Sequence, residues 1–452
     1  MRPYIIFITF FFISFFGWSQ RNFTLYHLEG TPQTHTMNPS FRPSSNVNVS
    51  FPLGMQSVGV SHSGFTFNDL FKPRPQDDSL EISPSTAIDA MRDLNHVNVD
   101  VMNELFGFGF RVNNSYFSFS AVNRLQTNLL YPKDLFVLAV EGNGRSLLGK
   151  RASFDGLGFN LNSYVEYNFG YNQIFNENLM VGIRAKLLSG AANVTTSRSI
   201  LGIYTDEETF DITVDGSMRI NSSNLAMFLE EDEEVPYQNF YNFSNRGLGL
   251  DAGVSYIATD KLLLSASMND LGFINWNSNV RNISSSDVEY TFRGVDLNQL
   301  MNDSLDVFDQ MVDSLRSILN ETEDTDSYRT SLYTRFYLGG RYQINKRVGA
   351  TVLMYNEIVN RRYRAGLYVG LNAKLGQWLS ASVNYGYYGR SWRNVGVGLS
   401  LRGGPVQYFI GVDNVMAGVN IGNHKNVHFT TGLTLMFGKP DKEKEPGSLK
   451  FL

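Results

Sequence analysis

Residues 363–374 read YRAGLYVGLNAK, a stretch in which apolar residues alternate with polar or small ones. Successive side chains of a β-strand point to opposite faces, so this stretch predicts a strand with one apolar and one polar face. The same pattern recurs through residues 327–437 in short segments separated by turns. Two-faced strands of about ten residues, repeated in this way, are typical of a transmembrane β-barrel with lipid outside and a polar interior.

Alternation also marks earlier parts of the chain, although less regularly. The segments predicted as strands before residue 327 are 46–51, 57–67, 106–112, 115–123, 134–141, 154–171, 179–190, 246–257 and 261–268. Tight turns alternate with longer connections along the second half, as in outer-membrane barrels whose short turns face the periplasm. We therefore predict an all-β fold for residues 46–437: a transmembrane antiparallel up-and-down β-barrel of about 14 strands, within a range of about 14–16.

The two ends of the chain differ from the middle. Residues 1–19 have the pattern of a secretory signal peptide, with a basic start, an apolar core and small residues before a cleavage point. Residues 20–45 are polar and proline-bearing, and predict a periplasmic or luminal arm with little regular structure. Residues 438–452 are charged and predict a C-terminal periplasmic tail. The expected location is the outer membrane of a Gram-negative cell.

Insertions interrupt the alternating segments. Residues 84–94 have helix-start chemistry and predict a short helix. Residues 191–245 and 269–326 predict long extracellular loops. Within the second, leucine, methionine and phenylalanine residues recur at helical spacing and predict an amphipathic helix over about 295–319, placed in an outer loop.

Composition narrows the function classes. Charged residues make up 18% of the chain and the net charge is −5, which leaves no basic footprint for nucleic acid. The absence of cysteine excludes disulfides and lipid attachment at an N-terminal cysteine. His424 and His428 are four residues apart, but they lie in a predicted loop and strand start rather than on a helix. No histidine stands beside a plausible nucleophile in the sequence, so we predict no enzyme, no metal site and no cofactor.

Polar side chains on the inward face of the predicted strands are the candidate wall of a ligand route. They are Glu166, Arg184, Lys186, Arg364, Asn372, Lys374, Asn384, Arg402, Gln407 and Asp413. A hairpin turn near Ile174 would bring Glu166 close to Arg184 on the polar face. Such a pair suits the lumen, because charges on the lipid side of a barrel are strongly destabilising.

Four motifs carry a family resemblance. They are TMNPSF (36–41), NDLGFINW (269–276), GPVQYFIGVDN (404–414) and TGLTLMFG (431–438). Together they resemble a family of outer-membrane barrels from Bacteroidota whose function is unassigned. That family is itself similar to the PorV and PorQ barrels of type IX secretion and, more distantly, to FadL-type transporters. The resemblance implies a barrel of about fourteen strands and carries over no ligand-binding residue.

Two functions remain open. The first is a transporter or channel for a small ligand, hydrophobic compounds included, and an open lumen or a lateral opening would favour it. The alternative is a non-transporting accessory or scaffold barrel of an outer-membrane secretion or assembly complex, as in PorV-like proteins. A filled lumen with an exposed apolar loop surface would favour that alternative and an envelope protein as partner.

The expected lipid partners are outer-membrane lipid and lipopolysaccharide. Arginines at the outward ends of neighbouring hairpins are the candidates for lipopolysaccharide phosphates, for an anionic ligand at the mouth, or for simple interfacial anchoring. They are Arg361, Arg362, Arg364, Arg390 and Arg393.

Overall fold

The computed structural model describes residues 23–438 apart from 27, 29, 52–53, 75, 78, 226–242, 286, 294–321, 360–361, 377 and 390. The helices of the described part are α2 (Phe23–Tyr26), η1 (Pro32–Thr36), α3 (Phe67–Leu70), α4 (Pro84–Ala90), α5 (Lys133–Glu141), α9 (Met416–Val419) and η3 (Ile421–Asn423). In this part of the chain no helix is both long and apolar enough to cross a bilayer.

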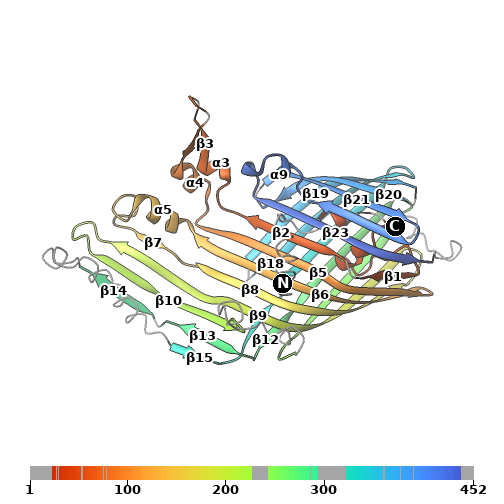
Figure 1. Ribbon diagram of the computed structural model, residues 1–452, viewed down its shortest axis with the longest axis horizontal. Helices are drawn as coiled ribbons and strands as arrows, with labels where there is room; N and C mark the ends of the chain where they lie inside the picture. The colour runs from red at the N-terminus through yellow and green to blue at the C-terminus, as the bar shows by residue number, and fades with distance from the viewer. Residues whose placement is uncertain are drawn as a thin grey trace, which may run out of the picture.

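Strands make up most of the molecule (Figure 1). Those of the first half are β1 (Val47–Ser50), β2 (Gln56–His62), β3 (Phe71–Pro73), β4 (Leu80–Ile82), β5 (Leu94–Val112), β6 (Ser115–Pro132), β7 (Arg151–Ser153), β8 (Gly158–Ile174), β9 (Leu179–Thr205) and β10 (Ile212–Ser223). Those of the second half are β11 (Asn245–Thr259), β12 (Leu262–Trp276), β13 (Val280–Ser284), β14 (Val288–Phe292), β15 (Thr322–Asp324), β16 (Tyr328–Ser331), β17 (Thr334–Gln343), β18 (Val348–Val359), β19 (Arg362–Leu375), β20 (Leu379–Tyr388), β21 (Ser391–Gly403), β22 (Val406–Val412) and β23 (Asn426–Phe437).

Within the described residues, fourteen antiparallel wall strands close into a barrel. β1 and β2 act as one interrupted wall strand, and the wall continues through β5, β6, β8, β9, β11, β12 and β17 to β23. Closure comes from β23, which pairs with β1 through Val47 opposite Phe437 and with β2 through Val58 opposite Phe429. The predicted fold class is confirmed.

The alternation that predicted the strands separates the outer face of the barrel from its lumen. On β19, Leu367, Val369 and Leu371 are 42–56% exposed, whereas Tyr368 and Asn372 are buried. A closed wall has no strand edge to hydrate, so an apolar outer band suits acyl chains.

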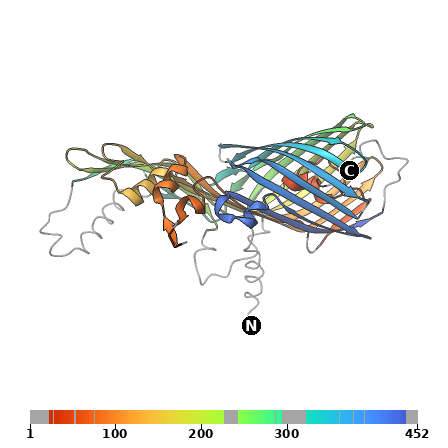
Figure 2. The same ribbon diagram turned by 90° about the horizontal axis from the view of Figure 1, so that it is seen from above.

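Several strands continue past the barrel, on the side away from its short turns, and form a thin extension (Figures 1 and 2). β9 alone has 27 residues, and its distal part pairs with β10 and β7. Residues 191–245, expected as a loop, therefore contain the distal part of β9 and all of β10, and residues 269–326 contain the end of β12 and the short strands β13, β14 and β15. Within the first of these segments the sequence indicated a hairpin over 210–220, and β10 covers most of that range. Polar residues such as Thr195 and Arg198 interrupt the apolar alternation in distal β9, which is why the pattern did not indicate that strand there.

Helices α5 and α4 differ in kind or in length from the segments predicted there. Residues 134–141, expected as a strand, form helix α5, whose Val137 packs with Ile88 and Phe154 in a small apolar cluster under the extension. A short continuous apolar run fits either element, and here the helix begins directly after Pro132. The helix expected over 84–94 ends at Ala90, and the helix expected over 295–319 lies outside the described residues.

The wall is irregular at Met55, just before β2. Here the carboxylate of Glu104 accepts a hydrogen bond from the Met55 N–H (3.3 Å), and the Met55 carbonyl accepts one from the Glu104 N–H (2.8 Å). β5 carries a bulge between Glu104 and Phe106 at the same level. A Cβ on Gly54 would lie 2.9 Å from the Glu104 side chain, so this close approach requires glycine. A side chain thus replaces part of the regular ladder at this point of the wall.

Candidate functional site

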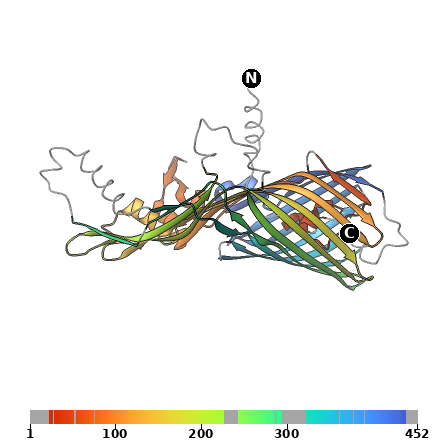
Figure 3. The same cartoon turned by 90° about the horizontal axis from the view of Figure 1, so that it is seen from below.

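The N-terminal arm lies inside the barrel, where Figures 2 and 3 show its first helix surrounded by wall strands. We call residues 23–45 the plug. Phe23, Leu25 and Tyr26 are at most 3% exposed, as deeply buried as any core residue. Of the two positions expected for residues 20–45, periplasmic or luminal, the structure shows the luminal one for the described part.

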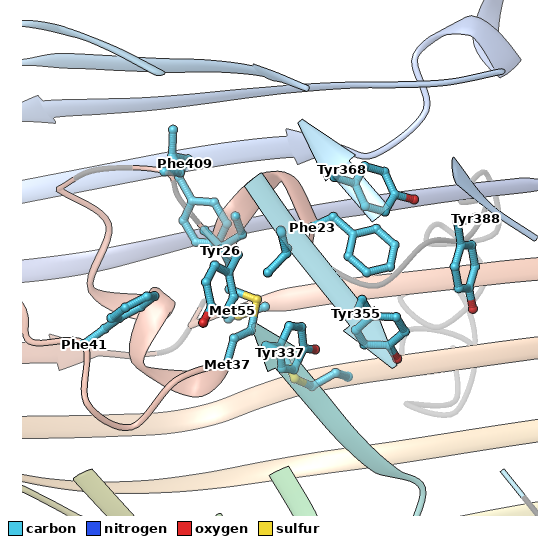
Figure 4. Close-up of a cluster of buried hydrophobic side chains, with 14 of the residues drawn as sticks. Phe23, Tyr26, Met37, Phe41, Met55, Tyr337, Tyr355, Tyr368, Tyr388 and Phe409 are labelled. Atoms are coloured by element: carbon cyan, nitrogen blue, oxygen red, sulfur yellow. The ribbon is translucent and has the colours of Figure 1, made fainter. Parts of the chain in front are cut away.

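The side chain of Phe23 is enclosed by three tyrosines from consecutive wall strands (Figure 4). Its ring stacks on Tyr368 at 4.2 Å between centroids, meets Tyr355 edge-on at 4.8 Å and lies 5.4 Å from Tyr388. We call Tyr355, Tyr368 and Tyr388 the tyrosine cage. Offset and edge-on ring contacts of this kind stabilise beyond their buried area.

Asp413 holds the start of the plug by its backbone. Its two carboxylate oxygens accept hydrogen bonds from the N–H groups of Phe23 (3.1 Å) and Thr24 (2.7 Å). These are free donors at the first turn of α2, which a carboxylate satisfies well. Asn384 adds a side-chain hydrogen bond to Thr24 Oγ1 at 2.9 Å.

A buried chain of polar groups supports Asp413 from behind. Nδ1 of His428 lies 3.2 Å from the carboxylate, and Nε2 of His428 lies 2.5 Å from Ser57 Oγ. This order of groups is that of a serine hydrolase, but all three residues are buried and both oxygens of Asp413 are engaged by the plug. The arrangement holds the Asp413 carboxylate in place for the backbone of the plug.

His424, the other half of the histidine pair, bonds to Asn414, and within the described residues no cluster of metal-ligand side chains occurs.

A second group of contacts holds the turn at Met37–Pro39. Arg184 donates hydrogen bonds to the carbonyl groups of His35 (3.2 Å) and Thr36 (2.7 Å). Asn269 donates to the Met37 carbonyl at 2.6 Å. A Cβ on Gly253 would lie 2.1 Å from Asn38 Oδ1, so the plug approaches the wall more closely here than any other residue would allow.

Beneath this turn the wall carries a connected set of buried charges. Arg184 pairs with Asp251 (2.8 Å), and Lys186 contacts Asp251 (3.1 Å), Asp270 and Glu166 (3.9 Å). Arg335 bridges Asp270 (2.9 Å), Asp100 (3.0 Å) and Glu357 (3.3 Å), and Arg124 pairs with Glu166 at 3.1 Å. Mutual neutralisation makes such a set tolerable in a buried environment.

The expected pairing of Glu166 with Arg184 is wrong. Glu166 lies opposite Leu188 and forms ion pairs with Arg124 and Lys186. β8 runs on to Ile174 before the turn, so the register differs by four residues from the one expected.

The structure places the sequence-predicted lining residues on the inward side of the wall in two degrees of burial. Glu166, Arg184, Lys186, Asn372, Asn384, Gln407 and Asp413 are buried, and Arg364, Lys374 and Arg402 are half-buried. Arg364 reaches Asn98 and Asn128 at 3.5 Å, whereas Arg402 bonds to Gly404 at a short turn. Asn384, Asp413 and Arg184 each form hydrogen bonds with the plug. Lys186 is linked to this group through Asp251, which also pairs with Arg184.

Small cavities adjoin the plug, and two of them lie beside its main contacts with the wall. One lies between its Thr36–Met37 turn and the ionic residues Lys186, Asp270 and Arg335. The other lies beside Phe23 and is lined by Tyr368, Asn372 and Asn384, among others. Both have room for water rather than for an organic ligand, so among the described residues the docked plug fills these parts of the lumen.

Comparison with known proteins places the chain in a family without giving it a function. The model of a family of unknown function, DUF5723, matches residues 39–413, so the chain belongs to that family. No curated protein matches it.

Solved structures are similar over nearly the whole chain at low identity. The Ralstonia pickettii toluene transporter TbuX is 9% identical, with 91% of this chain and 97% of that chain covered and a TM-score of 0.42. A Pseudomonas aeruginosa FadL homologue is 10% identical, with 93% and 100% covered and a TM-score of 0.42. The Pseudomonas putida toluene transporter TodX is 10% identical, with 91% and 96% covered and a TM-score of 0.39. Such values carry no argument about a ligand, and the resemblance to PorV-like barrels stays a prediction.

Proposed function

We propose that this member of the DUF5723 family is an outer-membrane transporter for a small, mainly apolar ligand, and that the plug is its gate. The observation that carries the proposal is how the plug is held. Within the described residues, α2 and η1 contact the wall through individual hydrogen bonds and ring contacts and join no strand of the sheet. A segment held in this way can leave its position while the barrel stays closed.

Release of α2 would expose an apolar chamber in a wall that is otherwise polar inside. Phe23 and its neighbours belong to one apolar cluster that also includes Tyr26, Met55, Leu353 and Phe409 (Figure 4). Ligand sites are typically apolar cavities with a few well-placed polar groups. The wall residues of this cluster, which pack against the plug when it is docked, would then be free to contact an apolar compound.

The interruption between β1 and β2 gives such a compound a way into the wall. Met55 belongs to the same apolar cluster as Phe23, and it sits where Glu104 replaces regular ladder hydrogen bonds. Opening at this point would break fewer strand–strand bonds than opening elsewhere. We therefore place the lateral end of the route beside Gly54 and Met55.

A removable tether tests the gate directly. The chain has no cysteine, so Thr24→Cys with Asn384→Cys introduces one possible disulfide between plug and wall, at a contact where the two side chains already meet. In proteoliposomes loaded with a solvatochromic apolar dye, we expect the oxidised double variant to lose most of its flux and reduction to restore it. Each single-cysteine variant is the matched control. Equal flux through the oxidised and reduced double variant would overturn the proposal.

A role as a binding platform for an envelope protein is the second candidate, and one observation favours it. The hairpin of β3 and β4 projects from the molecule (Figure 1) and carries Leu80 and Ile82 at 56% and 61% exposure, with Phe67 nearby at 52%. Exposed apolar groups of this kind mark interaction surfaces. Affinity purification in mild detergent should recover a stoichiometric partner with the natural chain and lose it with Ile82→Asp. Recovery of the barrel alone would remove this candidate.

A further inference from the structure

The plug shows what chemistry the chamber recognises. At its first residue it presents an aromatic ring to the tyrosine cage and an N–H group to Asp413. The ring and the N–H donor are only a few bonds apart. Phe23 is therefore an arylalkylamine-like group, held by rings on one side and by a carboxylate on the other.

A second observation extends this acceptor character beyond Asp413. Asn384 is 9% exposed and borders the cavity beside Phe23, and its Oδ1 has no hydrogen-bond partner among the described residues. Its Nδ2 donates to Thr24 Oγ1 (2.9 Å), so the acceptor oxygen remains for another donor. Buried acceptors without a partner are rare, because desolvation without a hydrogen bond is unfavourable.

We infer that the ligand of this chamber is a small aromatic amine, which replaces Phe23 by placing its ring in the tyrosine cage and its N–H donors on Asp413 and Asn384. The inference rests on the proposed function and names the chemical class of its ligand. Tyrosine faces attract cations, and a charge-assisted hydrogen bond to a carboxylate is stronger than a neutral one. An aromatic hydrocarbon of the same shape would occupy the ring position but would supply no hydrogen-bond donor to Asp413 or Asn384.

Competition with the plug explains why the site is occupied in the resting protein. The plug belongs to the same chain, so its effective concentration at the chamber is high, in the millimolar range for short linkers. A free amine must exceed that local concentration or find the plug weakened. Variants at Phe23 therefore reveal the site without changing the wall.

Two substitutions at one position separate the ring from the N–H group. Phe23→Ala vacates the ring position but keeps the N–H on Asp413. Phe23→Pro vacates the ring position and also removes that N–H, at the first residue of α2, where proline is well tolerated. The probes are 2-phenylethylamine and propylbenzene, which share their shape and differ in an ammonium against a methyl group.

Binding to the purified full-length barrel in detergent is measured by calorimetry, with heat-modifiable migration as the check on folding. We expect Phe23→Pro to bind the amine at least about tenfold more tightly than the hydrocarbon. We expect Phe23→Ala to show little preference, and Asp413→Asn in the proline background to remove the preference. Equal affinities for both probes in Phe23→Pro, or binding of neither probe, would overturn the inference.

The Thr24→Cys/Asn384→Cys protein supplies a second measurement in a chain that keeps Phe23 and Asp413 and lacks the acceptor of Asn384, so it tests the contribution of Asp413 alone. Excess amine should slow disulfide formation several-fold by displacing the plug, and propylbenzene should slow it less; equal rates would also overturn the inference. Failure of the transport proposal looks different. In that case the amine would bind selectively while oxidation of the tether left flux unchanged.

Discussion

The lumen of this barrel has two unlike halves. The ionic half carries the buried charges centred on Arg184, Lys186 and Arg335, and it grips the plug by its carbonyl groups. The aromatic half carries the tyrosine cage and Phe409, and it holds the plug by a ring and by N–H groups on Asp413. The buried charges of the first half neutralise one another whether or not the plug is present. The second half, in contrast, can exchange one apolar occupant for another. The ionic half is thus a fixed frame, and the aromatic half is the exchangeable site.

The largest effect is expected from Arg335→Met. The guanidinium bridges three carboxylates, and its loss leaves Asp270 and Glu357 buried with fewer partners. Breaking a buried ion pair by removing one partner typically lowers the free energy of unfolding by about 3–5 kcal/mol. Denaturant unfolding of the purified barrel measures it. Arg281→Met, which removes an exposed pair with Glu323, is the control and should change stability by less than about 1 kcal/mol.

Steric blocking of the turn comes next. Gly253→Ala would place a Cβ 2.1 Å from Asn38 Oδ1 and 3.0 Å from Pro39 Cδ, and we expect docking of the plug to weaken by about 1–3 kcal/mol. Faster hydrogen exchange at the plug amides, with unchanged exchange in the wall, is the expected signature. Gly403→Ala meets no atom within 4 Å and should change neither. Normal protection of the plug in Gly253→Ala would show that the turn is held loosely.

The wall strands could be predicted from the sequence because contact with lipid requires apolar side chains on the outer face of every strand. Leu367, Val369 and Leu371 must all point outward, so their spacing is visible in the sequence alone. No such rule acts on the distal part of β9, where Ser197 and Arg198 are exposed and alternation is lost. The same lack of periodicity hid α2, since one turn of helix in a polar arm leaves no pattern to detect.

The candidate site was only partly within reach of the sequence. Asn384 and Asp413 were identified as inward-facing, because the face of a strand follows from alternation. Their common partner, Thr24, lies 389 residues from Asp413 and 360 residues from Asn384, and no local pattern connects residues so far apart. The partner of Glu166 was missed for a different reason. Alternation fixes the face of a residue, but the length of the turn fixes its register, and that turn starts later than expected.

Acid should loosen the plug at His35. Burial and the nearby charge of Arg184 lower the pKa of His35 from 6.5 to about 4. Because a released plug would take up a proton at higher pH than a docked one, docking is strongest above about pH 6.5 and weakens as the pH falls toward 4. We expect docking to weaken by up to about 2 kcal/mol between pH 7 and pH 5. The rate of Thr24→Cys/Asn384→Cys disulfide formation, referred to the thiolate fraction at each pH, measures it. His35→Gln should make the corrected rate independent of pH over this range.

The smallest effect is expected in the extension, and it sharpens the contrast with the ionic half. Arg151 bonds to Asp215 at 2.6 Å, a contact as short as those of the lumen, but both side chains are 34% exposed. Water competes for exposed ions, so Arg151→Met should lower the free energy of unfolding by only about 0.2–1 kcal/mol, and high salt should remove the difference. The same salt series should leave the Arg335→Met effect nearly intact, since buried pairs are screened little. Similar salt sensitivity of the two variants would mean that water enters the ionic half freely, and the fixed frame assigned to it would be lost.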